Sequence, residues 1–155
     1  MNQYVKQYQK SSIETASREQ ILIMLYDGAI QFLNKAKIAI ESKNIEEIHN
    51  NLIGAQKIIQ EFIDSMDREV APQLAENLIS LYEYFIRRLV YANMKKQVEP
   101  IDEVLKYLKG LKATWEQAIM LAQKEQQQSS PDGYKSVDLS DDEEDGDDEE
   151  DEDEE

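Results

Sequence analysis

The sequence contains no cysteine and only one histidine, five glycines and three prolines among its 155 residues. Without cysteine, the chain cannot form a disulfide scaffold, a cysteine zinc site or a thiol nucleophile. No stretch approaches the ~18 consecutive apolar residues that a membrane helix requires. Residues 1–12 also lack the apolar segment of a secretory signal. We therefore expect a cytoplasmic protein that does not insert into a membrane.

Acidic residues are concentrated at one end of the chain. Residues 131–155 hold 16 acidic residues and one lysine, and they account for almost all of the net charge of −16. Residues 1–130 hold 17 acidic and 16 basic residues. Because this body lacks the basic field that nucleic-acid binding requires, no nucleic-acid partner is expected.

The acidic end has little apolar surface to bury and repels itself, so residues 129–155 are predicted to be a disordered acidic tail. Three interpretations of this tail remain open. It could be a solubilising extension, an electrostatic competitor for basic partners, or an artificial extension of the protein.

Four segments show the periodicity of helices, with turn signals between them. They run from about Ser17 to Ser42, from about Asn44 to Met66, from near Pro72, and from near Pro100. Ser17 and Gln20 have the spacing of a capping box. Because the joining segments are short, consecutive helices must be antiparallel neighbours. The sequence thus predicts an all-α fold, an antiparallel up-down four-helix bundle.

This bundle is expected to occupy residues 1–128 as one domain, followed by the tail over 129–155. Residues 1–14 form a short N-terminal cap segment, in which Tyr4, Val5 and Tyr8 are the apolar anchors. Each helix is predicted to carry one inner stripe at steps of three and four residues. In chain order, these stripes are Ile21, Leu25, Gly28, Phe32, Ala36 and Ala39; Ile45, Ile48, Leu52, Ala55, Ile59, Phe62 and Met66; Leu74, Leu78, Leu81, Phe85, Leu89 and Ala92; and Ile101, Val104, Leu108, Leu111, Trp115 and Ile119.

The helices carry more apolar residues than one inner stripe requires. Such residues could widen the core or lie singly on the surface. As a set, they favour a groove that receives another amphipathic segment. The residues outside the inner stripes are Ile23, Tyr26, Ile30 and Leu33 on the first helix, Ile79, Tyr84, Ile86, Val90 and Tyr91 on the third, and Tyr107 on the fourth.

Catalysis finds no support in the sequence, and no catalytic residue, cofactor or metal ligand is predicted. Glu46 and His49 have a Glu-x-x-His spacing like that of di-iron bundles, but such sites require two of these motifs. His49 is the only histidine. It also has no nucleophile beside it to activate.

Three blocks of the sequence resemble the flagellar secretion chaperone FliS family. They are Thr15–Ser17 followed by Ile21–Ala29, Asn77–Leu89 with Ala92 and Asn93, and Ile101–Leu111 with Trp115. The resemblance covers about residues 4–123. Many members have a proline after the Thr-Ala-Ser, where this chain has Arg18, and members usually end soon after the fourth helix.

The resemblance implies a cytoplasmic monomer, not an enzyme, that binds the disordered C-terminal region of flagellin. It would prevent premature polymerisation and assist type III flagellar secretion, with an export-gate component as a candidate second partner. Two alternatives are a chaperone that binds basic, histone-like proteins through the tail and a metal-dependent bundle enzyme. The groove candidates are Ile23, Tyr26, Ile30, Ile79, Ile86, Val90 and Tyr91, and the cap candidates are Tyr4, Val5, Tyr8 and Ile13.

Overall fold

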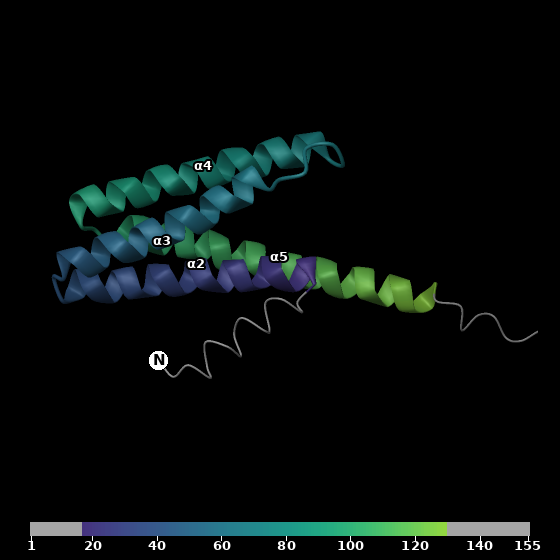
Figure 1. Cartoon of the computed structure of the whole chain (residues 1–155), viewed down its shortest axis with the longest axis horizontal. Coiled ribbons are helices and arrows are strands. Elements are labelled where there is room, and N and C mark those ends of the chain that lie inside the picture. Colours follow the sequence, from purple (N-terminus) through teal and green to yellow (C-terminus); the bar gives the residue numbers. More distant parts are fainter. Residues whose placement is uncertain (1–16, 130–155) are drawn as a thin grey trace, which may run out of the picture. The chain divides into compact units, whose positions relative to one another are not determined.

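The computed structural model describes residues 17–129, and helices account for nearly all of that range (Figure 1). The helices are α2 (Arg18–Glu41), α3 (Ile45–Asp64), α4 (Pro72–Lys95) and α5 (Glu99–Gln128). The predicted all-α class is confirmed. The cap segment and almost all of the predicted tail lie outside the described residues.

The helices begin where the sequence predicts. The Ser17 hydroxyl accepts a hydrogen bond from the Gln20 backbone at 3.2 Å, and the Gln20 side chain accepts one from the Ser17 backbone at 3.0 Å. This reciprocal pair satisfies two donors that the first turn of α2 would otherwise leave free. Asn44 caps α3 through the backbone of Glu47, and Pro72 occupies the first position of α4, where its missing N–H costs nothing.

Ion pairs define the direction of α5 against α2. Asp27, early in α2, pairs with Lys112 late in the packed part of α5, while Lys37, later in α2, pairs with Asp102 near the start of α5, each at 2.6 Å. The two helices are therefore antiparallel. α2 packs along α3, and α3 packs along α4 (Figure 1). The predicted antiparallel bundle is confirmed.

A single apolar core lies between the helices. Its α2 side is built largely of alanine, which allows close helix approach, while α3, α4 and α5 contribute larger side chains. The buried apolar residues of this core are Tyr26, Ala29, Leu33, Ala36, Ala39, Ile48, Leu52, Ala55, Ile59, Phe62, Ile63, Leu78, Tyr82, Phe85, Leu89, Ala92, Ile101, Val104, Leu105 and Leu108.

The predicted inner stripes are correct for most of α3, α4 and α5 but wrong for the first half of α2. Tyr26 and Leu33, expected to face outward, have no exposed surface, whereas Ile21 is 36% exposed. Residues 21–26 are all apolar, so periodicity alone does not select the inward face of this stretch. Ile45 and Leu74 were also expected in the core, and both are exposed because they lie in the first turn of their helices.

The packed helices form one compact unit that ends at Met120, and the last turns of α5 belong to a second unit from Leu121. The domain boundary between residues 128 and 129 stays a prediction.

Two glycines allow side chains to pack closely between α2 and α3. A methyl group added to Gly54 would lie 2.7 Å from the Phe32 ring, and one added to Gly28 would lie 3.2 Å from the end of Ile58. Contacts below about 3 Å require the neighbour to move. Gly54 therefore lets the Phe32 ring lie directly on the backbone of α3.

Substitution Gly54→Ala should lower stability by about 1–2 kcal/mol, because overpacking outweighs the ~1 kcal/mol gain in helix propensity. Urea unfolding followed by circular dichroism measures this change. In a Phe32→Ala background the clash is absent, and the same substitution should become neutral or stabilising. An equal effect in both backgrounds would contradict the proposed contact.

Candidate functional site

The Tyr26 hydroxyl lies at the centre of the bundle and not on its surface. It hydrogen-bonds the Tyr82 hydroxyl of α4 at 2.5 Å and accepts a hydrogen bond from the Trp115 indole of α5 at 3.1 Å. Burial raises the pKa of Tyr26 and also that of Tyr82. Both hydroxyls thus remain protonated and satisfied inside the core, which explains why a polar aromatic residue is tolerated there.

The two other groove candidates on α2, Ile23 and Ile30, lie on the side of this helix that faces α5. Ile23 and Ile30 are four residues before and three residues after Asp27, so they share its side of the helix. Asp27 pairs with Lys112 of α5, and this carboxylate raises the pKa of Lys112. Ile23 and Ile30 are half-buried, and Ile30 packs against the core.

The groove candidates on α4 lie on two different sides of this helix. Ile79, Ile86 and Val90 are seven and four residues apart and share one face, which continues to Asn93 and its contact with α3. Tyr91 lies on the opposite flank, under the guanidinium of Arg88 at 5.3 Å. Arg88 in turn pairs with Glu103 of α5. The structure therefore does not gather the predicted residues into one groove.

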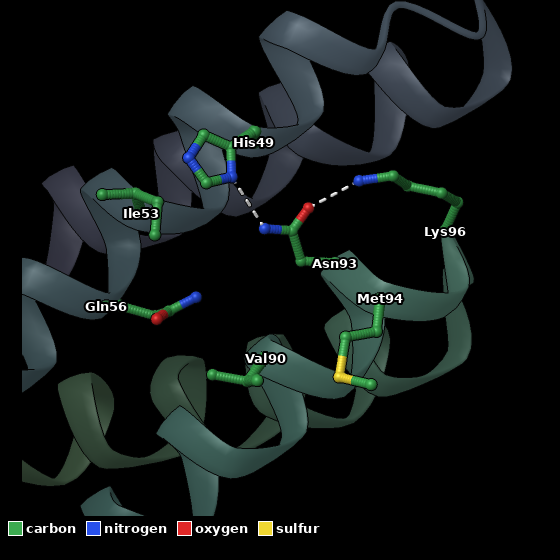
Figure 2. Close-up of a pocket in the computed structure, with 7 residues that line it drawn as sticks. All are labelled: His49, Ile53, Gln56, Val90, Asn93, Met94 and Lys96. Carbon is green, nitrogen blue, oxygen red and sulfur yellow. Dashed lines mark hydrogen bonds between the residues drawn. The ribbon is translucent and has the colours of Figure 1, made fainter.

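Val90 lines a shallow hollow between α3 and α4 (Figure 2). Ile53 of α3 and Val90 and Met94 of α4 supply its apolar surface. Val90 is 42% exposed and Met94 73% exposed, so this surface is open to solvent. Sequence reasoning missed Ile53 and Met94, although Met94 follows Val90 by one helical turn.

A hydrogen-bonded chain of polar side chains closes one end of this hollow (Figure 2). Lys96 donates to the Asn93 oxygen at 2.7 Å, which leaves the Asn93 amide to donate to His49 Nδ1 at 2.9 Å. His49 is therefore an acceptor at Nδ1 and carries its proton on Nε2 in this arrangement. Among the described residues, no group of three or more potential ligands lies close enough to hold a metal ion.

A larger groove, of about 540 Å³ compared with about 350 Å³, lies between α4 and α5. Leu81, Tyr107 and Leu111 provide its apolar lining. Tyr107, which the sequence placed among the outward residues, is 47% exposed and packs against Phe85 with ring centroids 5.6 Å apart. Leu81 and Leu111 were expected in the core, and both are only half-buried.

The acidic member of this groove, Glu103, is already engaged within the chain. The Tyr84 hydroxyl donates to one of its oxygens, and Arg88 donates to the other at 2.9 Å. The hydrogen bond from Tyr84 and the nearby Arg88 hold the pKa of Glu103 below its usual value. The same hydrogen bond raises the pKa of Tyr84. Glu103 is thus a structural link between α4 and α5.

The outside of the bundle therefore carries two apolar hollows, one between α3 and α4 and one between α4 and α5. No helix within that range is long and apolar enough to cross a bilayer. The cap candidates Tyr4, Val5, Tyr8 and Ile13 lie outside the described residues.

Comparison with known proteins identifies the family. The sequence profile of the flagellar protein FliS matches residues 1–123. The chain belongs to the FliS family. It is 36% identical over 118 residues to the flagellar secretion chaperone FliS of Bacillus subtilis, covering 76% of this chain and 87% of that protein. It is 38% identical over 117 residues to the flagellar secretion chaperone FliSB of Pseudomonas aeruginosa, covering 72% and 92%.

A third relative, the flagellar secretion chaperone FliS of Escherichia coli, is 30% identical over 112 residues, which is 72% of this chain and 82% of that protein. The FliS match ends at residue 123, so it includes α2, α3, α4 and most of α5 and stops before the acidic tail.

The buried tyrosines predict an alkaline limit to stability. Tyr26 and Tyr82 titrate near pH 10 when unfolded and above it when folded, so the unfolded state loses protons first as the pH rises. The contribution of these two tyrosines to the free energy of unfolding is therefore complete below about pH 9 and declines above about pH 10. The difference in unfolding free energy between the wild type and the Y26F/Y82F variant should shrink between about pH 9 and pH 11. A constant difference across this range would contradict the buried placement.

Proposed function

We propose that this chain is a cytoplasmic export chaperone that binds the disordered C-terminal region of flagellin. Binding would prevent premature polymerisation and assist type III flagellar secretion. The observation that carries the proposal is the pair of open apolar hollows on the outside of the bundle. These hollows lie outside the apolar core of a chain that belongs to the FliS family. Apolar surface of this kind on the outside of a soluble domain is typical of a site for a protein partner.

A disordered client suits these surfaces. It can fold into short amphipathic helices as it binds, with apolar side chains at helical spacing seated between pairs of helices. Ordering the client consumes part of the interaction free energy, so a large contact area yields only moderate affinity. A chaperone that later releases its cargo requires this combination.

The predicted contact residues remain in the proposal, with one exception. Tyr26 has no exposed surface, so it contributes to the core and does not contact the client. Since the others lie on different flanks of the bundle, the client would have to extend over more than one face. The retained residues are Ile23, Ile30, Ile79, Ile86, Val90 and Tyr91.

Further parts of the proposal follow from the family. In the absence of flagellin, the N-terminal residues Tyr4, Val5, Tyr8 and Ile13 would cover part of the binding surface. An export-gate component would be a second partner. The chaperone would act as a monomer, as the resemblance to the family implies.

Substitution Val90→Asp should weaken binding of a flagellin C-terminal peptide at least about tenfold, because it places a charge on the apolar part of the α3–α4 hollow. Isothermal titration calorimetry measures the affinity, and circular dichroism checks that helicity is unchanged. Val70→Asp is the matched control. Val70 is 83% exposed in the segment between α3 and α4 and does not line the hollow. Equal affinities for both variants would remove the hollow from the binding surface.

The salt dependence of the same titration separates this function from recognition of basic proteins by the acidic tail. Binding through apolar burial should persist between about 0.1 M and 0.5 M salt and show a negative heat-capacity change. Binding through the tail should be lost, because the distance over which exposed charges interact falls from about 10 Å at 0.1 M salt to well below that at 0.5 M. Loss of peptide binding at the higher concentration would favour the tail.

A further inference from the structure

A single polar contact joins α3 to α4, and it lies at one end of the hollow between them (Figure 2). The Asn93 amide of α4 donates to His49 Nδ1 of α3 at 2.9 Å. Within residues 17–129, no other side-chain hydrogen bond or ion pair links these two helices. Their remaining contacts are apolar, like that between the Phe62 and Tyr82 rings. Because apolar contacts are not directional, the hydrogen bond is the one directional link between α3 and α4.

Lys96 determines which way the Asn93 amide points. Its ammonium group donates to the Asn93 oxygen at 2.7 Å, and an ammonium group can only donate. The amide nitrogen of Asn93 must therefore face His49, and this nitrogen is also only a donor. His49 Nδ1 has to accept, which requires a neutral ring with its proton on Nε2. The three side chains are thus mutually satisfied in one protonation state of His49 only.

Protonation of His49 creates a conflict that the amide cannot resolve. An imidazolium ring carries a proton on both nitrogens, so its Nδ1–H would face the N–H of Asn93. Reversing the amide would satisfy His49 but would turn the same N–H towards Lys96. The bond from Lys96 is the shorter of the two and is charge-assisted, so it persists and the bond to His49 breaks. Repulsion between the two cations acts in the same direction.

Few charged groups surround His49. Lys96 is the only charged residue besides the histidine that lines the hollow, and no residue of α2 or α5 lines it. On α3 itself, Glu46 precedes His49 by three residues and shares its side of the helix. Both side chains are exposed. Glu46 attracts an imidazolium along α3, but it offers Asn93 no acceptor, so it does not replace the lost link to α4.

We propose that His49, Asn93 and Lys96 form a proton-sensitive latch between α3 and α4. The latch is closed when the His49 ring is neutral and open when it is protonated, a change that histidine undergoes between about pH 8 and pH 5. Opening leaves only apolar contacts between the two helices and frees the polar end of the hollow. Val90 and Met94 beside the latch are 42% and 73% exposed, so they add little packing that would hold this end shut. The latch belongs to the free bundle and does not depend on the proposed client.

Urea unfolding of the full chain at about pH 7.5 and pH 5.5 tests the latch, with His49→Asn as the reference. An asparagine oxygen at this position can still accept from Asn93 and does not titrate. On acidification, the folding equilibrium constant of the wild type should fall about twofold to tenfold relative to that of the variant, as expected for one lost hydrogen bond. The ratio removes the effect of carboxylates that titrate in both proteins. An unchanged ratio, or a relative gain in wild-type stability through Glu46, would overturn the inference.

Asn93→Asp is a matched variant for which the expected sign is opposite. A carboxylate at this position can accept from Lys96 and from a protonated His49 together. In this background, the same acidification should raise stability relative to the double variant His49→Asn/Asn93→Asp. A change of the same sign in both backgrounds would show that the pH dependence does not pass through residue 93, and the latch would be abandoned.

Discussion

The bundle depends on a contact in which all four helices meet. The Tyr26 hydroxyl of α2 bonds the Tyr82 hydroxyl of α4, and the Trp115 indole of α5 donates to the same Tyr26 oxygen. Phe62 of α3 stacks on the Tyr26 ring at 4.6 Å and contacts the Tyr82 ring at 5.4 Å. A buried hydroxyl without a partner would cost about 1–3 kcal/mol. The three polar groups must therefore be aligned, and this requirement favours one register of the helices over shifted ones.

Once the core is packed around these aromatic residues, the remaining apolar side chains cannot be buried in it. α2 contributes alanines to the interior at positions 29, 36 and 39, so its neighbours pack close to it and the interior is narrow. The surplus apolar side chains of α4 and α5 then remain at the edges of the helices, where hollows form. The two hollows of this FliS-family protein are thus a consequence of how its core is filled.

The fold could be predicted from the sequence because its signals are local. A capping residue, a proline at the first helical position and a three-to-four periodicity act within one turn of the chain. The inward face of α2 could not be predicted. Tyr26 is stabilised inside the bundle by partners 56 and 89 residues away, and its type gives no indication of them. Periodicity predicted Val90 as an outward residue, but only the packed helices reveal that Ile53 lies beside it in the same hollow.

The glycines show how one residue type can serve opposite purposes in one bundle. At Gly54, the space of the missing side chain is filled by Phe32 of the same chain, so this glycine contributes to folding. At Gly110, no described atom fills that space, so this glycine lowers helix propensity without a gain in packing within residues 17–129. Selection for stability alone would replace such a residue with alanine. Packing within residues 17–129 therefore does not explain the glycine in the α4–α5 groove.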